Sequence, residues 1–600
     1  MSMKNKKRSN LIRLYSYAKP HFPWFAFGLA LILIATISSL IQPVLVQRMI
    51  DTDIARLASG AANPELQGVA LSGILRTTLL YLLMTLITFI AGYGSTYLLN
   101  YLGQKILKRI RQDLYDHILK LPMSFYDENA IGSIVTRVTN DTETLNEMFT
   151  TVLSNVFNNL FQLTGIILIM YSLNPGLASL VIILMPVILL ISVIFRRAIR
   201  RVYEQQRRIL SMINAKLAEN ISGITVIQLF HKQKSIYEEF DEENKGYLKV
   251  GEVEVKYFSI YRPAIEIVRT LGIALLIWFG GQGSLNGAIS FGVLYAFIDY
   301  IQRFYQPILN LAETFNVIQS AMTSSKRIFR LMDREEEDEG GDILPGEDFR
   351  GAIEFSHVWF SYDKESADEE KEWILRDVSF SIQAGHFVAF VGATGAGKTT
   401  IMSLITRFYD VDKGAVLIDG INVKDYNLEA LRKKIGVVQQ DVFLFTGNIM
   451  DNISLHRPEV SEEMAMEAAR KVNVDRFIES LPKAYQQPVT ERGSTFSAGQ
   501  RQLLSFARTI SANPNILILD EATSNIDTET EELIQDAIIT MTEDRTTLAV
   551  AHRISTIADA DLIIVMHHGR VAEQGTRDEL IEKDGLFRIL YDLQYKNSVS

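Results

Sequence analysis

Apolar residues concentrate in the first half of the chain, before about residue 320, and most of the acidic excess follows them. A helix that crosses a bilayer needs roughly 20 mostly apolar residues. Six stretches of the first half qualify, and the third to fifth contain long runs almost free of charge, which disfavours buried helices of a soluble protein. We therefore expect a membrane domain over 1–330, with helices at about 24–50, 74–102, 148–173, 176–198, 262–282 and 288–312.

Basic residues indicate which helix ends face the cytoplasm, because Lys and Arg are enriched in cytoplasmic loops. They cluster before the first helix (Lys4, Lys6, Lys7, Arg8, Arg13), after the second (Lys105, Lys108, Arg109, Arg111) and after the fourth (Arg196, Arg197, Arg200, Arg201). The connections on the other side carry little positive charge. The sequence thus predicts a multi-pass protein of the plasma (inner) membrane, with both termini and the second half in the cytoplasm.

Two cytoplasmic connections, 103–150 and 196–255, are charged, mostly free of Pro and Gly, and have helical spacing. We expect the spans to continue through them as long cytoplasmic helices. Each is interrupted once by a glycine-bearing segment, near 125–141 and near 219–230. Helix ends that protrude this far need a surface to dock on, and the second half of the chain supplies one.

Charged residues inside the spans allow two interpretations. Arg262, Glu266 and Arg269 share one helix face, and Asp299 and Arg303 lie four residues apart. They either form ion pairs along their own helices or line a polar path for a substrate. In the second case four aromatic residues would add surface to the path: Tyr295, Tyr300, Phe304 and Tyr305.

Composition limits the number of domains, the cysteine chemistry and the partners that the chain can have. At 600 residues the chain is too long for one ordinary core, so at least two domains are expected. It has no cysteine, which excludes disulfides, thiolate chemistry and cysteine-ligated metals. The formal net charge of −10 gives no indication of nucleic-acid binding.

After a charged linker over 331–350, the domain at 351–600 carries a phosphate-binding motif. FVAFV reads as a buried strand and TTIMSLITRF as a helix, and GATGAGKT between them fits the P-loop pattern. Its glycines let the backbone wrap an oxyanion, Lys398 would reach the β- and γ-phosphates, and Thr399 would hold Mg²⁺. The residues expected to bind nucleotide here are Gly392, Ala393, Thr394, Gly395, Ala396, Gly397, Lys398, Thr399 and Thr400.

Two further buried strands end in polar residues. NILILDEATS places Asp520 where it could hold Mg²⁺ and Glu521 where it could polarise an attacking water. The plainer interpretation is that two acids solvate a strand end. TTLAV leads to AHR, so His552 could sense the γ-phosphate. We expect Glu521, His552 and Lys398 to be the catalytic residues.

The stretch TFSAGQRQ changes abruptly into LLSFARTI, which has helical spacing. Small residues at such a helix start leave backbone amides open to an anion. Together with the P-loop, this stretch resembles the signature of an ABC transporter half-unit of the exporter type, usually LSGGQ. The resemblance covers nearly the full chain.

The resemblance implies several further roles. Gln440 matches the glutamine that contacts Mg²⁺ and the membrane domain, and Tyr362 the aromatic residue that stacks on adenine. Ser524–Asp527 match the D-loop, and Glu491 a contact loop for the cytoplasmic helices. The segments at 125–141 and 219–230 match the coupling regions. In this family two ATPase domains stack head to tail, so the signature residues Ser497, Ala498, Gly499 and Gln500 would meet the γ-phosphate of ATP on a second subunit.

Phe496 and Ala498 depart from LSGGQ, whereas Lys398, Asp520, Glu521 and His552 are intact. One interpretation is a harmless variation in a homodimer. The other is an asymmetric bacterial heterodimer, in which this chain supplies the complete Walker B glutamate and an altered signature. SNID in place of the usual SALD in the D-loop favours the second interpretation.

The expected fold is an N-terminal all-α transmembrane domain of six spans fused to a C-terminal α/β P-loop ATPase domain. The expected activity is ATP-driven, alternating-access export of amphiphilic small molecules or drugs, with ATP and Mg²⁺ as cofactors. The expected partners are a second half-transporter, the lipid bilayer and a small amphiphile, with no nucleic acid. Two alternatives stay open: a homodimeric lipid or glycolipid flippase, and an ATP-gated channel or regulatory ATPase.

Overall fold

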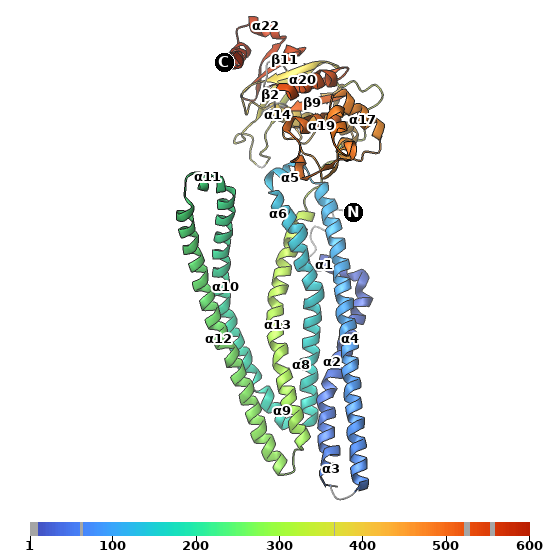
Figure 1. Ribbon diagram of the computed structural model, residues 1–600, viewed down its shortest axis with the longest axis vertical. Coiled ribbons are helices and arrows are strands. Elements are labelled where there is room, and N and C mark those ends of the chain that lie inside the picture. The colour runs from blue at the N-terminus through green and yellow to red at the C-terminus, as the bar shows by residue number, and fades with distance from the viewer. Residues whose placement is uncertain (1–9, 60–63, 365, 521–527, 552–557, 600) are drawn as a thin grey trace. The chain divides into compact units, whose positions relative to one another are not determined.

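The computed structural model describes residues 10–59, 64–364, 366–520, 528–551 and 558–599 (Figure 1). They separate into two compact units. A membrane unit comprises Met1–Leu119 and Gly132–Arg334, and an ATPase unit comprises Lys120–Ile131 and Glu335–Ser600. The short segment 120–131, from the first expected coupling region, therefore groups with the ATPase although the sequence assigned it to the membrane domain.

The membrane unit is entirely helical where it is described. Its long helices carry apolar residues over much of their length, and short 3-10 or π turns join or extend them. In chain order they are α1 (Asn10–Ala18), η1 (Lys19–His21), α2 (Phe22–Arg48), η2 (Met49–Ile54), α3 (Ala55–Ser59), α4 (Pro64–Leu119), α6 (Ile131–Thr136), η3 (Arg137–Asp141), α7 (Thr142–Glu147), η4 (Met148–Val152), α8 (Leu153–Leu173), α9 (Pro175–Ile182), α10 (Met185–Ser222), α11 (Ile224–Leu229), α12 (Gln233–Leu285) and α13 (Phe291–Met332).

Five helical stretches of the described chain are long and apolar enough to cross a membrane. They are Asn10–Ala58, Glu65–Leu119, Ile131–Leu173, Pro175–Ser222 and Gln233–Leu285. The expected sixth span lies in α13, whose apolar stretch is interrupted by Asp299 and Arg303. These charges lower its hydropathy, so the sixth span remains a prediction.

Four of the five charged residues singled out in the spans pair along their own helices. Arg303 forms an ion pair with Asp299 at 2.7 Å and donates a hydrogen bond to the Ser39 carbonyl at 3.0 Å. Arg269 is paired with Glu266. For these four residues the structure supports intrahelical ion pairing.

Three of the four aromatic residues assigned to a possible path are buried in the membrane unit. Tyr300, Phe304 and Tyr305 lie in its hydrophobic core, and the Tyr300 hydroxyl donates to the Leu40 carbonyl at 2.5 Å. Only Tyr295 is substantially exposed. These three side chains therefore pack in the core of the membrane unit, and Tyr300 also connects α13 to α2.

Close packing fixes α4 against the segment 137–152, which comprises η3, α7 and η4. A Cβ atom at Gly103 would lie 2.2 Å from the Thr150 side chain and 2.9 Å from that of Asn146. Small residues allow such backbone approach between membrane helices. Nearby, the buried Asp141 carboxylate is paired with Arg327 and accepts a hydrogen bond from Ser324 at 2.9 Å, which fastens the same segment to α13.

The helices α10 and α12 form a hairpin whose tip is α11 (Figure 1). Within the membrane unit this hairpin diverges from α13 toward the tip, as Figure 1 shows. Four large apolar side chains at the tip are exposed: Ile224, Val226, Leu229 and Phe230. The second expected coupling region therefore presents an apolar surface that the membrane unit does not cover.

The ATPase unit contains two main sheets. One is antiparallel in the order β2-β1-β4-β5, and the other has the order β12-β11-β3-β10-β9-β6, parallel except for β12. The strands are β1 (Ile353–Phe360), β2 (Leu375–Ile382), β3 (Phe387–Val391), β4 (Lys413–Ile418), β5 (Ile421–Asn422), β6 (Ile435–Val438), β7 (Gly447–Asn448), β8 (Pro488–Val489), β9 (Ile516–Asp520), β10 (Thr546–Val550), β11 (Leu562–His567) and β12 (Arg570–Gly575).

Helices flank these sheets and bury two large apolar clusters. The inner strands of the parallel sheet read as continuous apolar runs, as expected when both faces are covered. The helical elements are α5 (Met123–Glu128), α14 (Lys398–Ile405), α15 (Leu428–Lys433), α16 (Ile449–Ser454), α17 (Glu462–Lys471), α18 (Asp475–Ser480), η5 (Ala484–Gln486), η6 (Glu491–Gly493), α19 (Ala498–Ile510), α20 (Thr528–Thr542), α22 (Arg577–Glu582) and α23 (Leu586–Val599).

The packing at Gly103 generates a stability prediction. Gly103→Leu should lower the apparent Tm in detergent by several degrees, because overpacking a tight contact costs about 1–3 kcal/mol. The matched control is Gly92→Leu in the same helix, where a Cβ would meet nothing within 4 Å. Thermal unfolding followed by tryptophan fluorescence measures both, and equal Tm values would contradict the assigned contact.

Candidate nucleotide-binding site

The candidate site lies at one edge of the parallel sheet. Strands β3, β6, β9 and β10 run in the same direction, so their carboxyl ends meet at that edge. The P-loop follows β3, Gln440 follows β6, and Asp520 ends β9. Ligands of open α/β sheets bind outside the carboxyl ends of the strands. The structure therefore brings these three predicted elements to one edge.

Several predicted residues lie outside the described part of the chain. Glu521, His552 and the D-loop residues Ser524–Asp527 are among them. The strands that precede the two catalytic candidates, β9 and β10, are neighbours in register, with Asp520 opposite Val550. Glu491 opens the short turn η6.

Glycine is required at two P-loop positions. Gly392 has φ 154°, and a Cβ there would lie 2.3 Å from the Met566 carbonyl oxygen. Gly397 has φ 101°, and a Cβ there would lie 2.6 Å from the Leu375 side chain. Both are left-handed conformations that favour glycine. The loop can therefore curl tightly over the end of β3.

Lys398 is held inside this loop. Only 6% of the residue is exposed, and its Nζ donates hydrogen bonds to the carbonyls of Gly392 at 2.7 Å and Ala393 at 3.1 Å. The ammonium group thus lies under the loop whose amides would receive phosphate. Thr399, next along α14, is exposed.

The aromatic residue expected to stack on adenine is half exposed beside the loop. Tyr362 follows β1, and its hydroxyl lies 3.2 Å from the Oγ1 of Thr400. Its ring packs edge-on against Phe360 and Tyr409, with centroid distances of 4.9 and 5.1 Å. Packing against these two rings holds the Tyr362 ring in place, and about half of the residue stays exposed, where a base could contact it.

The signature stretch opens α19 with a capping box. The Ser497 Oγ accepts from the Gln500 amide at 3.1 Å, and the Gln500 side chain accepts from the Ser497 amide at 2.9 Å. The capping box occupies the backbone amides of Ser497 and Gln500. The amides of Ala498 and Gly499, in the first turn of α19, remain without an intrahelical acceptor. The Ser497 hydroxyl can still donate its hydrogen. Ser497 and Ala498 are exposed, so this helix start is accessible.

The first coupling segment contacts the nucleotide side of its own ATPase unit. The Tyr409 hydroxyl donates a hydrogen bond to Asp127 in α5. The Glu337 amide donates to the Lys120 carbonyl at 2.7 Å. Because Tyr409 also packs on Tyr362, one side chain connects α5 with the predicted adenine-binding residue.

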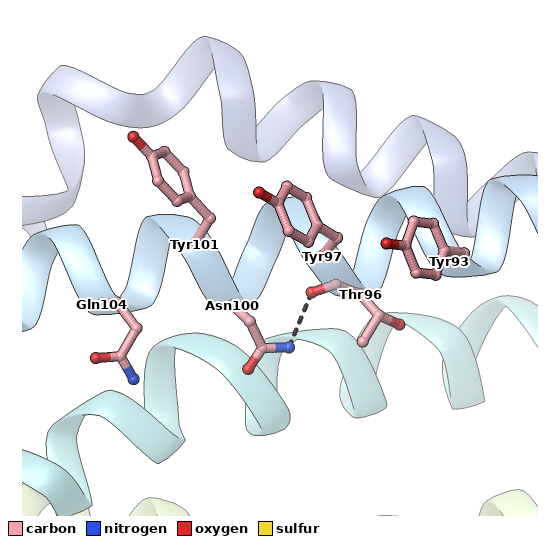
Figure 2. A pocket seen from close by; sticks show the side chains of 6 residues that line it. All are labelled: Tyr93, Thr96, Tyr97, Asn100, Tyr101 and Gln104. Atoms are coloured by element: carbon pink, nitrogen blue, oxygen red, sulfur yellow. Dashed lines mark hydrogen bonds between the residues drawn. The ribbon is translucent and has the colours of Figure 1, made fainter.

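Sequence analysis missed a row of aromatic residues on α4. Tyr93, Tyr97 and Tyr101 are each more than half exposed, and Tyr93 and Tyr97 stack at 6.2 Å. Figure 2 shows them beside a polar row from the same helix. The two rows line a cavity of about 390 Å³, whose polar residues are Thr96, Asn100 and Gln104. The four-residue spacing of the tyrosines was the available signal.

Comparisons with known proteins agree with this arrangement. Residues 25–308 match the ABC transporter transmembrane region, and residues 375–524 match the ABC transporter ATPase family. The "Putative ABC transporter ATP-binding protein exp8" of Streptococcus pneumoniae is 39% identical over 598 residues, which cover 99% of each chain. The "Fatty acid ABC transporter ATP-binding/permease protein" of Mycobacterium bovis is 36% identical, over 90% of this chain and 84% of its own.

Two further proteins extend the likeness. The "Probable multidrug resistance ABC transporter ATP-binding/permease protein YheH" of Bacillus subtilis is 39% identical, over 89% of this chain and 78% of its own. A solved bacterial Atm1-family ABC exporter with ATP bound has a TM-score of 0.76 at 26% identity, covering 96% of this chain and 99% of its own. The chain therefore belongs to the ABC transporter family, as an exporter-type half-transporter whose ATPase drives transport across a membrane.

Proposed function

We propose that this chain exports amphiphilic small molecules as the catalytically complete half of a heterodimer. The observation that carries the proposal is the combination of an intact P-loop and Walker B sequence with a signature altered at Phe496 and Ala498. ABC exporters work as dimers of half-transporters, so a second subunit must supply the opposite signature. A subunit with a full LSGGQ would complete the ATP site formed by Lys398 of this chain.

The ATP site follows from the residues at the sheet edge. The P-loop amides and Lys398 would bind the phosphates, and Tyr362 would stack on the base. The Lys398 ammonium, now bonded to two loop carbonyls, would turn toward the phosphate oxygens. Thr399, Gln440 and Asp520 offer hydroxyl, amide and carboxylate oxygens, the donors that suit Mg²⁺. When bound, this ion would neutralise charge on the β- and γ-phosphates.

Hydrolysis would use Glu521 as the base that orients and polarises water, with His552 beside the γ-phosphate. Both assignments rest on sequence. Support comes from the sequence: Glu521 directly follows β9 and His552 comes two residues after β10, and these adjacent strands end at the P-loop edge. A general base placed there would accept a proton from water as the bond to the γ-phosphate breaks.

Coupling between hydrolysis and transport would run through α5. This helix follows α4 along the chain and is bonded to the ATPase by Asp127 and Tyr409. Tyr409 in turn packs on Tyr362, so a change in nucleotide occupancy would be felt at α5. The exposed apolar tip at α11 offers a second contact surface, which we assign to the partner's ATPase domain.

The substrate class is inferred from α4. The tyrosine row offers aromatic surface, and the adjacent row of Thr96, Asn100 and Gln104 offers hydrogen-bonding groups (Figure 2). A cavity lined in this way suits a molecule that has both an apolar and a polar part. Drugs and fatty acids, which two relatives carry in their names, are both amphiphiles of this kind.

The role of Glu521 is tested by an isosteric change. Glu521→Gln should bind ATP normally and hydrolyse it about 10²–10⁴ times more slowly, because the base is lost and the shape is kept. The matched control is Glu532→Gln, an exposed glutamate of α20 that should hydrolyse ATP normally. Phosphate release and fluorescent-nucleotide binding measure the two steps. Undiminished turnover in Glu521→Gln would refute the assignment.

The Tyr409–Asp127 bond is tested by a double-mutant cycle. Tyr409→Phe should leave basal ATP hydrolysis near normal but lower Hoechst 33342 transport per ATP several-fold, because only the hydroxyl that holds α5 is removed. Asp127→Ala should have the same effect, and the double variant should be no worse than either. Transport in inverted vesicles and phosphate release give the ratio. Additive losses would show that the two residues act independently.

The heterodimer is tested by the mass of the native complex. Extracted in mild detergent from its own host, it should contain this 67.9 kDa chain and one different chain of similar size. The second chain should carry a full LSGGQ and lack the glutamate after its Walker B strand. A complex of two identical chains would show that Ala498 serves both sites and would overturn the asymmetric assignment.

A further inference from the structure

A basic cavity of about 600 Å³ lies where α1 meets α4 and α13 in the membrane unit. Its volume is within the range of ligand sites, about 300–1,000 Å³. The lining includes three permanent cations, Arg13, Lys105 and Arg109, together with His21 and one carboxylate, Asp113. Nothing in the proposed transport cycle uses this cavity.

The charges of the lining are unevenly compensated. Arg13 is held by Asp333 at 2.8 Å and lies over the Phe329 ring at 4.2 Å. Asp113 accepts a hydrogen bond from the Tyr17 hydroxyl at 3.0 Å.

Lys105 and Arg109 lie one helical turn apart on α4, exposed, and neither has a carboxylate partner among the described residues. Asp113 is the one carboxylate of the lining against three cations, so the cavity keeps an excess of positive charge at Lys105 and Arg109.

The sequence around the cavity indicates a position near the lipid headgroups. Lys105 and Arg109 come directly after the apolar part of α4, on the basic side that the sequence assigns to the cytoplasm. Phe22 and Trp24, at the start of α2, are exposed as in the aromatic belts of membrane proteins. On α1, exposed Leu11 adds apolar surface next to the basic lining.

The lining is also partly apolar. Ile12, Ile106, Phe329 and Met332 border the same cavity as the cations. A free phosphate would leave that surface unused, whereas a phospholipid would place its phosphate at the cations and its glycerol and first acyl carbons against the apolar side chains. Basic pockets between membrane helices on the cytoplasmic side are suited to anionic headgroups.

We propose that this cavity binds the headgroup of an anionic phospholipid from the cytoplasmic leaflet, with its phosphate between Lys105 and Arg109. Bound there, the lipid joins α1 to α4. Arg13 extends the connection to α13, because it is bonded to Asp333 directly after that helix. The lipid thus stabilises the junction from which the chain leads into the ATPase linker.

The test uses the purified full-length complex in detergent, titrated with short-chain phosphatidylglycerol and followed by native mass spectrometry and by apparent Tm. Phosphatidylglycerol should stay bound and raise the Tm, and phosphatidylcholine should do neither. Lys105→Gln with Arg109→Gln should weaken phosphatidylglycerol binding about 25-fold, since each basic residue near an anionic lipid contributes about fivefold. Lys108→Gln, an exposed neighbour outside the cavity, is the matched control and should bind normally.

Asp113→Asn should change the affinity for phosphatidylglycerol in the opposite direction. It removes the one negative charge of the lining and keeps an oxygen for the Tyr17 bond, so phosphatidylglycerol should bind more tightly. Glycerol 3-phosphate distinguishes a lipid from a soluble anion. Equal Tm shifts with glycerol 3-phosphate, or equal binding by the Lys105/Arg109 and Lys108 variants, would overturn the lipid site.

Discussion

Binding of phosphate by backbone amides is the constraint on which the ATPase unit depends. An oxyanion can be wrapped closely only where the chain carries no obstructing side chain. At Gly392 a single added carbon would lie 2.3 Å from a carbonyl oxygen of β11. The loop must follow a central strand, because the carboxyl ends of the parallel strands on either side then lie at the same edge of the sheet. The positions of Gln440 and Asp520 follow from that topology.

The half-transporter exposes surfaces that no other part of the described chain covers. The start of α19 has amides directed away from its own helix, and the tip at α11 carries exposed Val226 and Leu229. Exposed apolar patches of this kind are commonly covered by a partner. These surfaces have a common cause, since ABC exporters work as dimers of half-transporters. The α5 segment differs, because its contacts lie within the ATPase unit of its own chain.

Features encoded in local spacing could be predicted from the sequence. The P-loop between a strand and a helix, the Walker B strand ending at Asp520, and the long helical extensions are all patterns of this type. Features that depend on distant partners could not. Tyr300 and Phe304 were candidates for a substrate path, yet they are buried in the core of the membrane unit. The grouping of 120–131 with the ATPase depends on Tyr409, which is 282 residues from its partner Asp127. The basic cavity needs three helices, of which α1 and α13 are more than 270 residues apart in sequence.

The capping box at Ser497 clarifies what an alanine at position 498 changes. Ala498 is the first residue of α19, and it has an ordinary helical backbone that needs no glycine. Its methyl group is exposed and lies in no packed core. A glycine there would therefore serve ligand approach and not folding, because helix formation itself disfavours glycine relative to alanine by roughly 1 kcal/mol. Ala498 places a methyl group at the surface that would meet the partner's phosphate. The proposal of an asymmetric pair rests on this exposed methyl group at the predicted phosphate-facing surface.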